Sequence, residues 1–158
     1  MSGSETVVSY AFFDTSALVK RYADEPGTPA VDALVEDEEI TVVITSLSVI
    51  ETVSAFRRKQ NRHEIPGNAV DGLLSAFFHE ALADFRIVPM EEALFEHSFD
   101  LVLEDDLRTL DSLQLSAALS VHDDVETLSF VCADAELVSV ADAAGLDTMD
   151  PTADSPQS

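Results

Sequence analysis

Apolar residues along this 158-residue chain fall into short β-branched runs and longer stretches with helical spacing. Short apolar runs between turn residues predict strands, and apolar positions that recur every three to four residues predict helices. The predicted strands are residues 7–13, 40–44, 84–89, 127–133 and 146–149. The predicted helices are residues 15–23, 28–37, 46–60, a stretch that follows the break at Ile65-Pro66-Gly67 and runs to about Leu82, 91–104, 111–122 and 134–143.

Strands that alternate with helices form parallel βαβ units, so this pattern predicts an α/β fold. We expect a three-layer α/β/α sandwich with a central parallel sheet, in one domain that spans residues 1–150. The residues that follow, 151–158, are expected to form a disordered C-terminal tail. Gly145 stands where the C-cap of the last predicted helix is needed.

The charge of the chain changes the picture, because acids outnumber bases 31 to 8 and the net charge is −23. Only two of the bases are lysines, Lys20 and Lys59. Such a surface is similar to that of proteins from halophilic archaea, where molar salt shortens the Debye length to roughly 3 Å and screens the repulsion. We therefore expect such an origin and a fold that needs high salt. The same charge argues against a generic nucleic-acid coat protein.

Apolar segments also bear on location. No run is long enough to span a bilayer, and the first residues lack the basic and apolar regions of a leader segment. We expect a cytoplasmic protein with no membrane partner. A single cysteine, Cys132, excludes an internal disulfide, and its apolar neighbours predict a small buried thiol.

Four carboxylates occupy positions that a parallel sheet would bring to one edge. Asp14 and Asp134 each end an apolar strand, and the carboxyl ends of parallel strands lie on the same side. Glu51 lies about two turns into a very apolar helix that follows another strand end, and Asp111 begins a predicted helix. Acids that converge raise one another's pKa unless a cation neutralises them, so the pattern indicates a metal site.

Each aspartate also has a purely structural interpretation as a helix N-cap, and the sequence leaves that alternative open. For Asp111 the run Asp-Ser-Leu-Gln matches a capping box with Gln114. Glu51 has no lysine or arginine three or four residues away on its helix, so a withdrawn carboxylate there would lack a partner. A solvent-facing side chain is the alternative for Glu51.

Oxygen ligands without a nearby histidine or cysteine favour Mg²⁺ or Mn²⁺ over Zn²⁺. The histidines show no metal-ligand spacing and are interpreted as surface or structural residues: His63, His79, His97 and His122. A carboxylate-bound Mg²⁺ or Mn²⁺ keeps positions open for water and a phosphate oxygen. This is the equipment of a phosphodiester hydrolase.

Four segments in order resemble the signature segments of PIN-domain ribonucleases, and in particular those of VapC-like toxins from toxin–antitoxin modules. The segments are FFDTSALVKRY, ITSLSVIETVSAFRRK, LRTLDSLQLSAAL and SFVCADAELVSVADAAGL, and the similarity extends from residue 7 to about 150. The resemblance implies a PIN-like sandwich with an acidic pocket at the carboxyl edge of its sheet. It also implies a metal-dependent endoribonuclease that hydrolyses RNA as the toxin of such a pair.

The resemblance further implies roles for individual residues. The catalytic acids, which would bind Mg²⁺ or Mn²⁺, map onto Asp14, Glu51, Asp111 and Asp134. Ser16 matches a small hydroxyl residue near the metal, whereas Cys132 stands where the family often has Ser or Thr. The family's partners are a cognate antitoxin and a second copy of the toxin, so a homodimer is expected. Apolar residues of the predicted helices 28–37 and 46–60 suit either antitoxin contact or core packing: Val31, Leu34, Val35 and Phe56.

Bases are concentrated at the end of the helix that carries Glu51: Arg57, Arg58, Lys59 and Arg62. Arg58 lies two turns beyond Glu51 on the same face, and we take it, with Ser16, as a candidate for binding the RNA substrate. The preference of bases for a helix C-terminus explains the cluster equally well.

Other functions predict different residues. A PIN nuclease of RNA processing or decay outside a toxin pair would have the same fold and metal site, so the sequence does not separate it from a toxin. A catalytically silent PIN-like binding module predicts a broken acid set, and the set here is complete. A haloacid-dehalogenase-like phosphatase needs an aspartate where this chain has Ser16. A response-regulator receiver needs an acidic pair at the first strand end and a downstream lysine, and neither is present.

Overall fold

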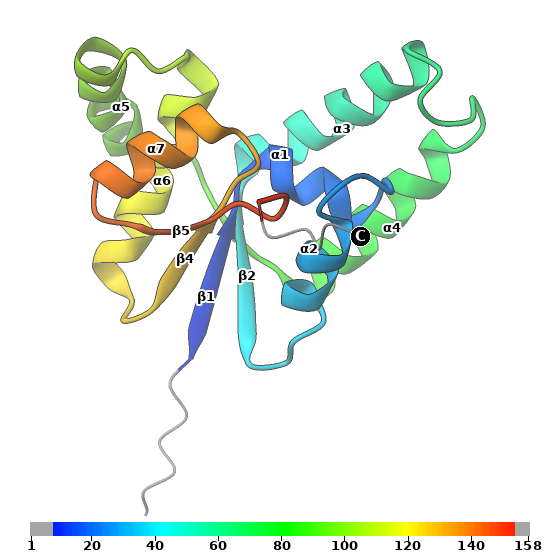
Figure 1. Cartoon of the computed structure of the whole chain (residues 1–158), viewed down its shortest axis with the longest axis horizontal. Coiled ribbons are helices and arrows are strands. Elements are labelled where there is room, and N and C mark those ends of the chain that lie inside the picture. The colour runs from blue at the N-terminus through cyan, green and yellow to red at the C-terminus, as the bar shows by residue number, and fades with distance from the viewer. Residues whose placement is uncertain (1–7, 154–158) are drawn as a thin grey trace, which may run out of the picture.

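The computed structural model describes residues 8–153 of the chain. Residue 7 of the first predicted strand, the residues before it, and residues 154–158 of the predicted tail lie outside the described residues. Within residues 8–153 the chain forms five strands and seven α-helices, arranged as Figure 1 shows. Each predicted strand and helix is present there.

The element bounds differ from the predictions mainly at their ends. The strands are β1 (Ser9–Phe13), β2 (Ile40–Thr45), β3 (Arg86–Val88), β4 (Leu128–Val131) and β5 (Asp147–Met149). The helices are α1 (Thr15–Leu18), α2 (Thr28–Val35), α3 (Ser46–Asn61), α4 (Val70–Asp84), α5 (Glu92–Asp105), α6 (Thr109–Asp124) and α7 (Ala135–Ala143). A 3₁₀ turn, Val19–Arg21, continues α1 and completes the first predicted helix.

The strands form one parallel sheet in the order β3-β2-β1-β4-β5, which confirms the predicted fold class. The chain builds outward from β1 to β2 and β3, and then returns to add β4 and β5 on the other side of β1. The carboxyl ends of β1 and β4 therefore flank the point where the strand order reverses. Open α/β sheets bind their ligands at such a switch point.

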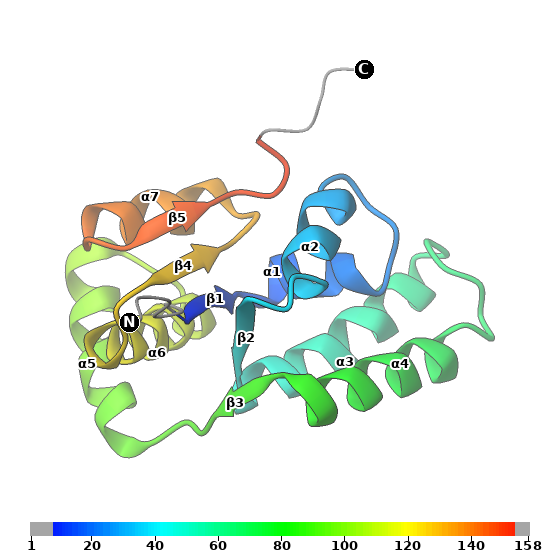
Figure 2. The same cartoon turned by 90° about the horizontal axis from the view of Figure 1, so that it is seen from below.

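Alternating strand residues supply two separate cores, one on each face of the sheet. Phe12 and Phe130 point to one face, where their rings stack at 5.8 Å among residues of α5, α6 and α7. Ala11, Phe13 and Val131 point to the other, toward helices α1 to α4. Figure 2 shows these two groups of helices on either side of the sheet. A period of two along each strand produces the three layers.

Chain segments at the C-terminal side close the domain. Gly145 has a φ of 100°, and Leu146 N donates to Ala141 O, so the predicted glycine cap of α7 is confirmed. Pro151 is buried against Gly27, which places the first residues of the predicted tail, 151–153, in the folded domain.

Helices of residues 8–153 are all too short or too polar to traverse a bilayer.

Candidate active site

A pocket of about 250 Å³ opens beside the carboxyl ends of β1 and β4. Its lining includes all six residues that the sequence singled out as site residues: Asp14, Ser16, Glu51, Arg58, Asp111 and Asp134. The four acids come from the end of β1, from α3, from α6 and from the end of β4. The fold therefore brings the predicted site together, while the roles of these residues in binding and catalysis stay predictions.

Asp14 is fixed by the sheet and by its own loop. Its backbone N–H donates to Val131 O on β4, and its carboxylate caps α1 by accepting from Ser16 N at 3.2 Å. Ser16 Oγ donates to the same Oδ2 at 2.7 Å. Burial raises the pKa of Asp14, hydrogen bonds from Ser16 oppose that rise, and the charge of Glu51 adds to it. Asp14 is thus both a cap and a pocket residue.

Asp134, after the end of β4, is likewise both a helix cap and a pocket residue. It caps α7, with Oδ1 accepting from Glu136 N at 2.9 Å and from Leu137 N at 3.2 Å, yet its side chain is exposed to the pocket. Cys132 lies between the two strand-end acids, with its Sγ 3.6 Å from Asp14 Oδ2. The thiol is fully buried, as predicted, and burial together with the charge of Asp14 raises its pKa. It therefore stays a protonated, weak donor to Asp14.

Asp111 does not begin its helix, so the predicted capping box with Gln114 is wrong. Helix α6 starts at Thr109 with Arg108 as N-cap, and Asp111 lies in the first turn. Gln114 turns inward and is 1% exposed instead of reaching back to the helix start. The box failed because local spacing placed the helix start two residues late. A first-turn aspartate still gains from the helix dipole.

Asp111 is repelled by the other three acids of the pocket. Burial and the surrounding acids raise the pKa of this carboxyl to about 6, and Arg108 opposes the shift. The acids responsible are, in order of effect, Asp14, Asp134 and Glu51. Carboxylates repel one another in this way when nothing positive lies between them.

Glu51 has partners that the sequence pattern did not reveal. Thr15 Oγ1 donates to Glu51 Oε1 at 2.8 Å, and Gln114 Nε2 donates to the same oxygen at 2.9 Å. Both donors are distant in sequence, so a search along one helix could not find them. One signal was available for Gln114, because a long polar side chain between Leu113 and Leu115 in a buried helix needs hydrogen-bond partners.

The basic cluster at the end of α3 divides between the pocket and the rest of the surface. Arg58 lines the pocket and donates to Ser54 Oγ at 2.6 Å. The other three bases bind elsewhere: Arg57 contacts Gln60, Lys59 contacts Glu25 and Glu64, and Arg62 contacts Glu64. Arg58 is therefore the member of this cluster that can reach a ligand in the pocket.

The donor set fits a divalent cation by its chemistry. Among residues 8–153, no three histidine, cysteine, aspartate or glutamate side chains are placed to hold one metal ion directly. Mg²⁺, however, usually binds through one or two carboxylates and keeps several waters. Four carboxylates around one pocket, with the pKa of Asp111 raised by burial and by repulsion from the other acids, supply hard oxygen ligands and an excess of negative charge.

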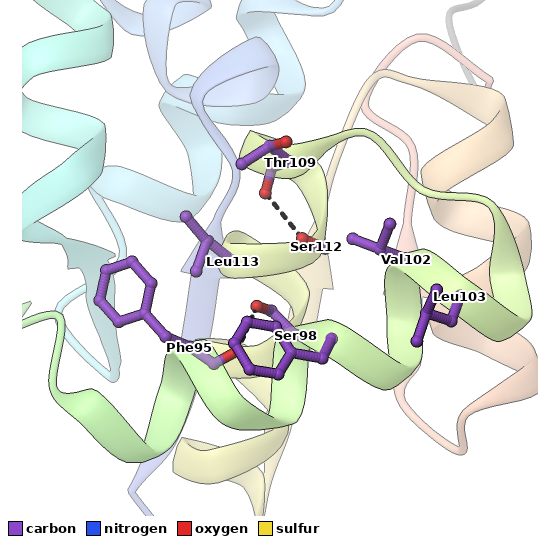
Figure 3. Close-up of a pocket in the computed structure, with 8 residues that line it drawn as sticks. Phe95, Ser98, Val102, Leu103, Thr109, Ser112 and Leu113 are labelled. Carbon is purple, nitrogen blue, oxygen red and sulfur yellow. Dashed lines mark hydrogen bonds between the residues drawn. The ribbon is translucent and has the colours of Figure 1, made fainter.

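A second hollow, of about 360 Å³, lies between α5 and α6 and is almost entirely apolar. Figure 3 shows its lining. The residues of this α5–α6 groove are Phe95, Ser98, Phe99, Val102, Leu103, Thr109, Ser112 and Leu113. Its apolar rim is exposed, with Phe99 at 60% and Leu103 at 81%. The groove offers a largely apolar contact surface.

Comparisons with known proteins agree with the fold. A family model described as the PIN domain matches residues 11–143. A Pyrobaculum aerophilum protein of known structure is 16% identical, with a TM-score of 0.65 over 92% of this chain and 88% of that one. The sarcin-ricin loop cleaving toxin VapC20 of Mycobacterium tuberculosis is 14% identical, with a TM-score of 0.63 over 86% and 95%.

A third similar structure is VapBC2 of Rickettsia felis bound to a DNA fragment from its promoter. It is 14% identical, with a TM-score of 0.60 over 89% of this chain and 97% of that one. The sequence matches no curated protein. At these low identities the structural similarity establishes the fold alone.

Proposed function

Because this chain belongs to the PIN-domain family, we propose that it is a metal-dependent endoribonuclease and the toxin of a toxin–antitoxin pair. The observation that carries the proposal is the single pocket into which four separate elements deliver four carboxylates. Similar folds in VapC20, a toxin that cleaves the sarcin-ricin loop, and in VapBC2 support the reaction and the pairing. The substrate is RNA, and the reaction is hydrolysis of its phosphodiester bonds.

In this proposal Asp14, Asp111 and Asp134 hold one or two Mg²⁺ or Mn²⁺ ions. A bound ion would stabilise charge on the phosphoryl oxygens and lower the pKa of a bound water. Glu51 either adds a ligand or orients the attacking water. Oε2 would do so, because Oε1 already accepts hydrogen bonds from two donors. No side chain needs to form a covalent intermediate.

Arg58 is the residue we assign to an RNA phosphate, since it lines the pocket and a planar guanidinium can donate two hydrogen bonds to the oxygens of one phosphate. Ser16 has less freedom, because its hydroxyl proton is donated to Asp14 Oδ2 and its oxygen accepts from Ala133 N at 3.0 Å. One lone pair of Ser16 remains for a substrate hydroxyl. Its main effect would be to fix Asp14.

A homodimer would use the α5–α6 groove. The exposed Leu103 and Phe99 lie on the same surface as the hollow that Phe95 and Leu113 line. A two-fold interface needs projection and hollow on one self-complementary patch. At 81% exposure, Leu103 is the side chain most able to enter the groove of a second copy.

The antitoxin would bind exposed apolar side chains of α3 and α4, here called the α3–α4 face: Ile50, Phe78 and Leu82, which are 67%, 38% and 78% exposed. Of the earlier candidates, Val31 and Phe56 are fully buried and Leu34 and Val35 are partly buried against the same core, so core packing accounts for them. An antitoxin would cover large exposed apolar side chains, as in most protein interfaces.

The proposal includes an origin in a halophilic archaeon and a cytoplasmic location. Its support is the excess of 31 acids over 8 bases in a folded domain. In the cytoplasm of a salt-accumulating cell, counterions would screen this surface and let an acidic protein approach RNA.

The test is cleavage of a labelled RNA pool at molar salt, with Mg²⁺ or Mn²⁺ and with chelator, by wild type and by Asp14→Asn. We expect metal-dependent cutting that falls about 10²–10³-fold or more in the variant. Asp142→Asn is the matched control, because Asp142 is exposed on α7 and does not line the pocket. Thermal unfolding would confirm that all three proteins are folded. Absence of cutting by well-folded wild type would favour a silent binding module.

A further inference from the structure

Gln114 is a buried polar side chain whose shorter hydrogen bonds lead to the helix that carries Glu51 and to its N-cap, with a longer contact to Thr15 of α1 at 3.4 Å. It lies on α6 and is 1% exposed, so its amide must be hydrogen-bonded within the protein. Nε2 donates to Ser48 Oγ at 2.6 Å and to Glu51 Oε1 at 2.9 Å. Oε1 of the amide accepts from Thr45 Oγ1 at 3.3 Å. The acceptor at Glu51 requires this orientation of the amide, because the reverse would place two oxygens together.

The same contacts fix the beginning of α3. Thr45 is its N-cap and accepts from Ser48 N at 3.0 Å, and both side chains are fully buried. The amide of Gln114 spans from this cap to Glu51, so it ties two turns of α3 to α6. Gln114 therefore links the position of Glu51 on α3 to that of Asp111, which lies on α6 with Gln114.

Glu51 receives a second donor from a third helix. Thr15 Oγ1, on α1 beside Asp14, donates to Glu51 Oε1 at 2.8 Å. Two donors fill the two lone-pair positions of one carboxylate oxygen. Oε1 is thus committed to the protein, and Oε2 is the oxygen that remains for a ligand in the pocket.

We infer that Gln114 is a positioning residue, which holds Glu51 Oε1 so that Oε2 alone serves the pocket. The inference rests on the proposed function, in which Glu51 binds the ion or orients the water. Side chains that hydrogen-bond a metal ligand commonly change metal affinity or activity 10–100-fold when they are removed. Without Gln114 the Glu51 carboxylate can rotate, and ordering it again would cost binding free energy.

The test measures Mn²⁺ affinity of the full chain at molar salt by electron paramagnetic resonance, for wild type and Gln114→Met. Methionine keeps the volume and removes the donor. We expect Mn²⁺ to bind about 10–100-fold more weakly, and kcat for RNA cleavage to fall similarly while KM changes little. Unchanged Mn²⁺ affinity in a folded Gln114→Met protein would overturn the inference.

Ser116→Ala is the matched control for lost stability. Ser116 lies on the same helix, is fully buried and donates to Leu94 O at 2.7 Å. This hydrogen bond does not involve any of the pocket carboxylates. Its removal should lower the unfolding temperature and leave Mn²⁺ affinity unchanged. If Gln114→Met does not fold, Thr15→Val removes the other donor to Glu51 Oε1 and should weaken Mn²⁺ binding in the same direction.

A second background separates positioning from general damage. In Glu51→Gln protein, Gln114→Met should cause no further loss of Mn²⁺ affinity, because the residue it acts through is already changed. Equal losses in both backgrounds would overturn the inference. A wild type that binds Mn²⁺ but cuts no RNA would defeat the proposed reaction alone, and the Mn²⁺ comparison would still decide the role of Gln114.

Discussion

Two hollows border the same helix, α6, and differ in the charge and polarity of the side chains that line them. Asp111 faces the carboxylate pocket, whereas its neighbours Ser112 and Leu113 line the α5–α6 groove. Successive helical residues point about 100° apart, so one turn of α6 serves both surfaces. The pocket has charged side chains that are held by hydrogen bonds, whereas the groove is lined mainly by apolar side chains, several of them exposed. The pocket is therefore suited to chemistry, and the groove is suited to docking.

Each hollow suits a different kind of binding partner. Burial and the concentrated negative charge of the pocket raise the pKa of Asp111, and a cation would relieve the repulsion. The groove exposes Phe99 and Leu103 to water, and an apolar partner would cover them. A change of charge should therefore affect binding at the pocket, and a loss of apolar contact should affect binding at the groove.

Removal of salt should have the largest effect, because it strengthens repulsion in the pocket and across the whole acidic surface. From about 3 M to about 0.1 M KCl the Debye length grows to about 10 Å. We expect the unfolding temperature, followed by circular dichroism, to fall by about 10 °C or more. Sucrose at low salt is the control, since it strengthens apolar burial without screening. An unchanged unfolding temperature would refute a salt-dependent fold.

Leu103→Glu should break the docking side of the comparison. In the proposed homodimer a carboxylate at the rim of the α5–α6 groove would have to be buried, so the dissociation constant of that dimer should rise about 30-fold or more. Sedimentation at molar salt measures this change. Leu82→Glu adds the same charge at a similarly exposed leucine on the α3–α4 face and should leave the dimer intact. Equal effects of both variants would remove the groove as the interface.

Arg58→Gln should weaken substrate binding in the pocket without changing the groove. The loss of one charge-assisted contact to phosphate predicts a KM for RNA about tenfold higher. Arg57→Gln makes the same charge change at an exposed residue outside the pocket lining, where it contacts Gln60. If the two variants raise KM alike, long-range charge and not contact explains the effect.

The smallest predicted effect is the pH dependence of metal-free protein. The pKa of Asp111 is raised from its ordinary 3.8 to about 6, so the folded state binds a proton more tightly than the unfolded state. Its contribution to the free energy of unfolding therefore falls as pH rises from about 4 to 6. Because this carboxyl is half-exposed, we expect less than about 1 kcal/mol.

Comparison with Asp111→Asn isolates that contribution from the other acids. Denaturant titrations between pH 4 and 7 should show a steeper loss of stability in wild type than in the variant. Saturating Mg²⁺ should reduce the difference, because a cation favours the ionised carboxyl. Identical pH profiles of wild type and variant would show that Asp111 is not strained.

Local patterns predicted most of the fold because they reflect local physics. Helix α3 was predicted over residues 46–60 and is observed over Ser46–Asn61, since its cap and its apolar period are both written in neighbouring residues. Asp111 shows the limit of such patterns. A capping box and an inward-facing glutamine share one spacing, and only burial of the helix distinguishes them.

The sequence by itself determined where strands end and which acids follow them, so Asp14 and Asp134 could be placed at one edge of a parallel sheet. The tertiary structure alone decided what surrounds Glu51. Its donors come from α1 and α6, and no spacing along the chain encodes a contact between helices that are distant in sequence. Hydrogen bonds of buried groups are settled by packing, because each donor is satisfied by whichever acceptor the folded chain brings within reach.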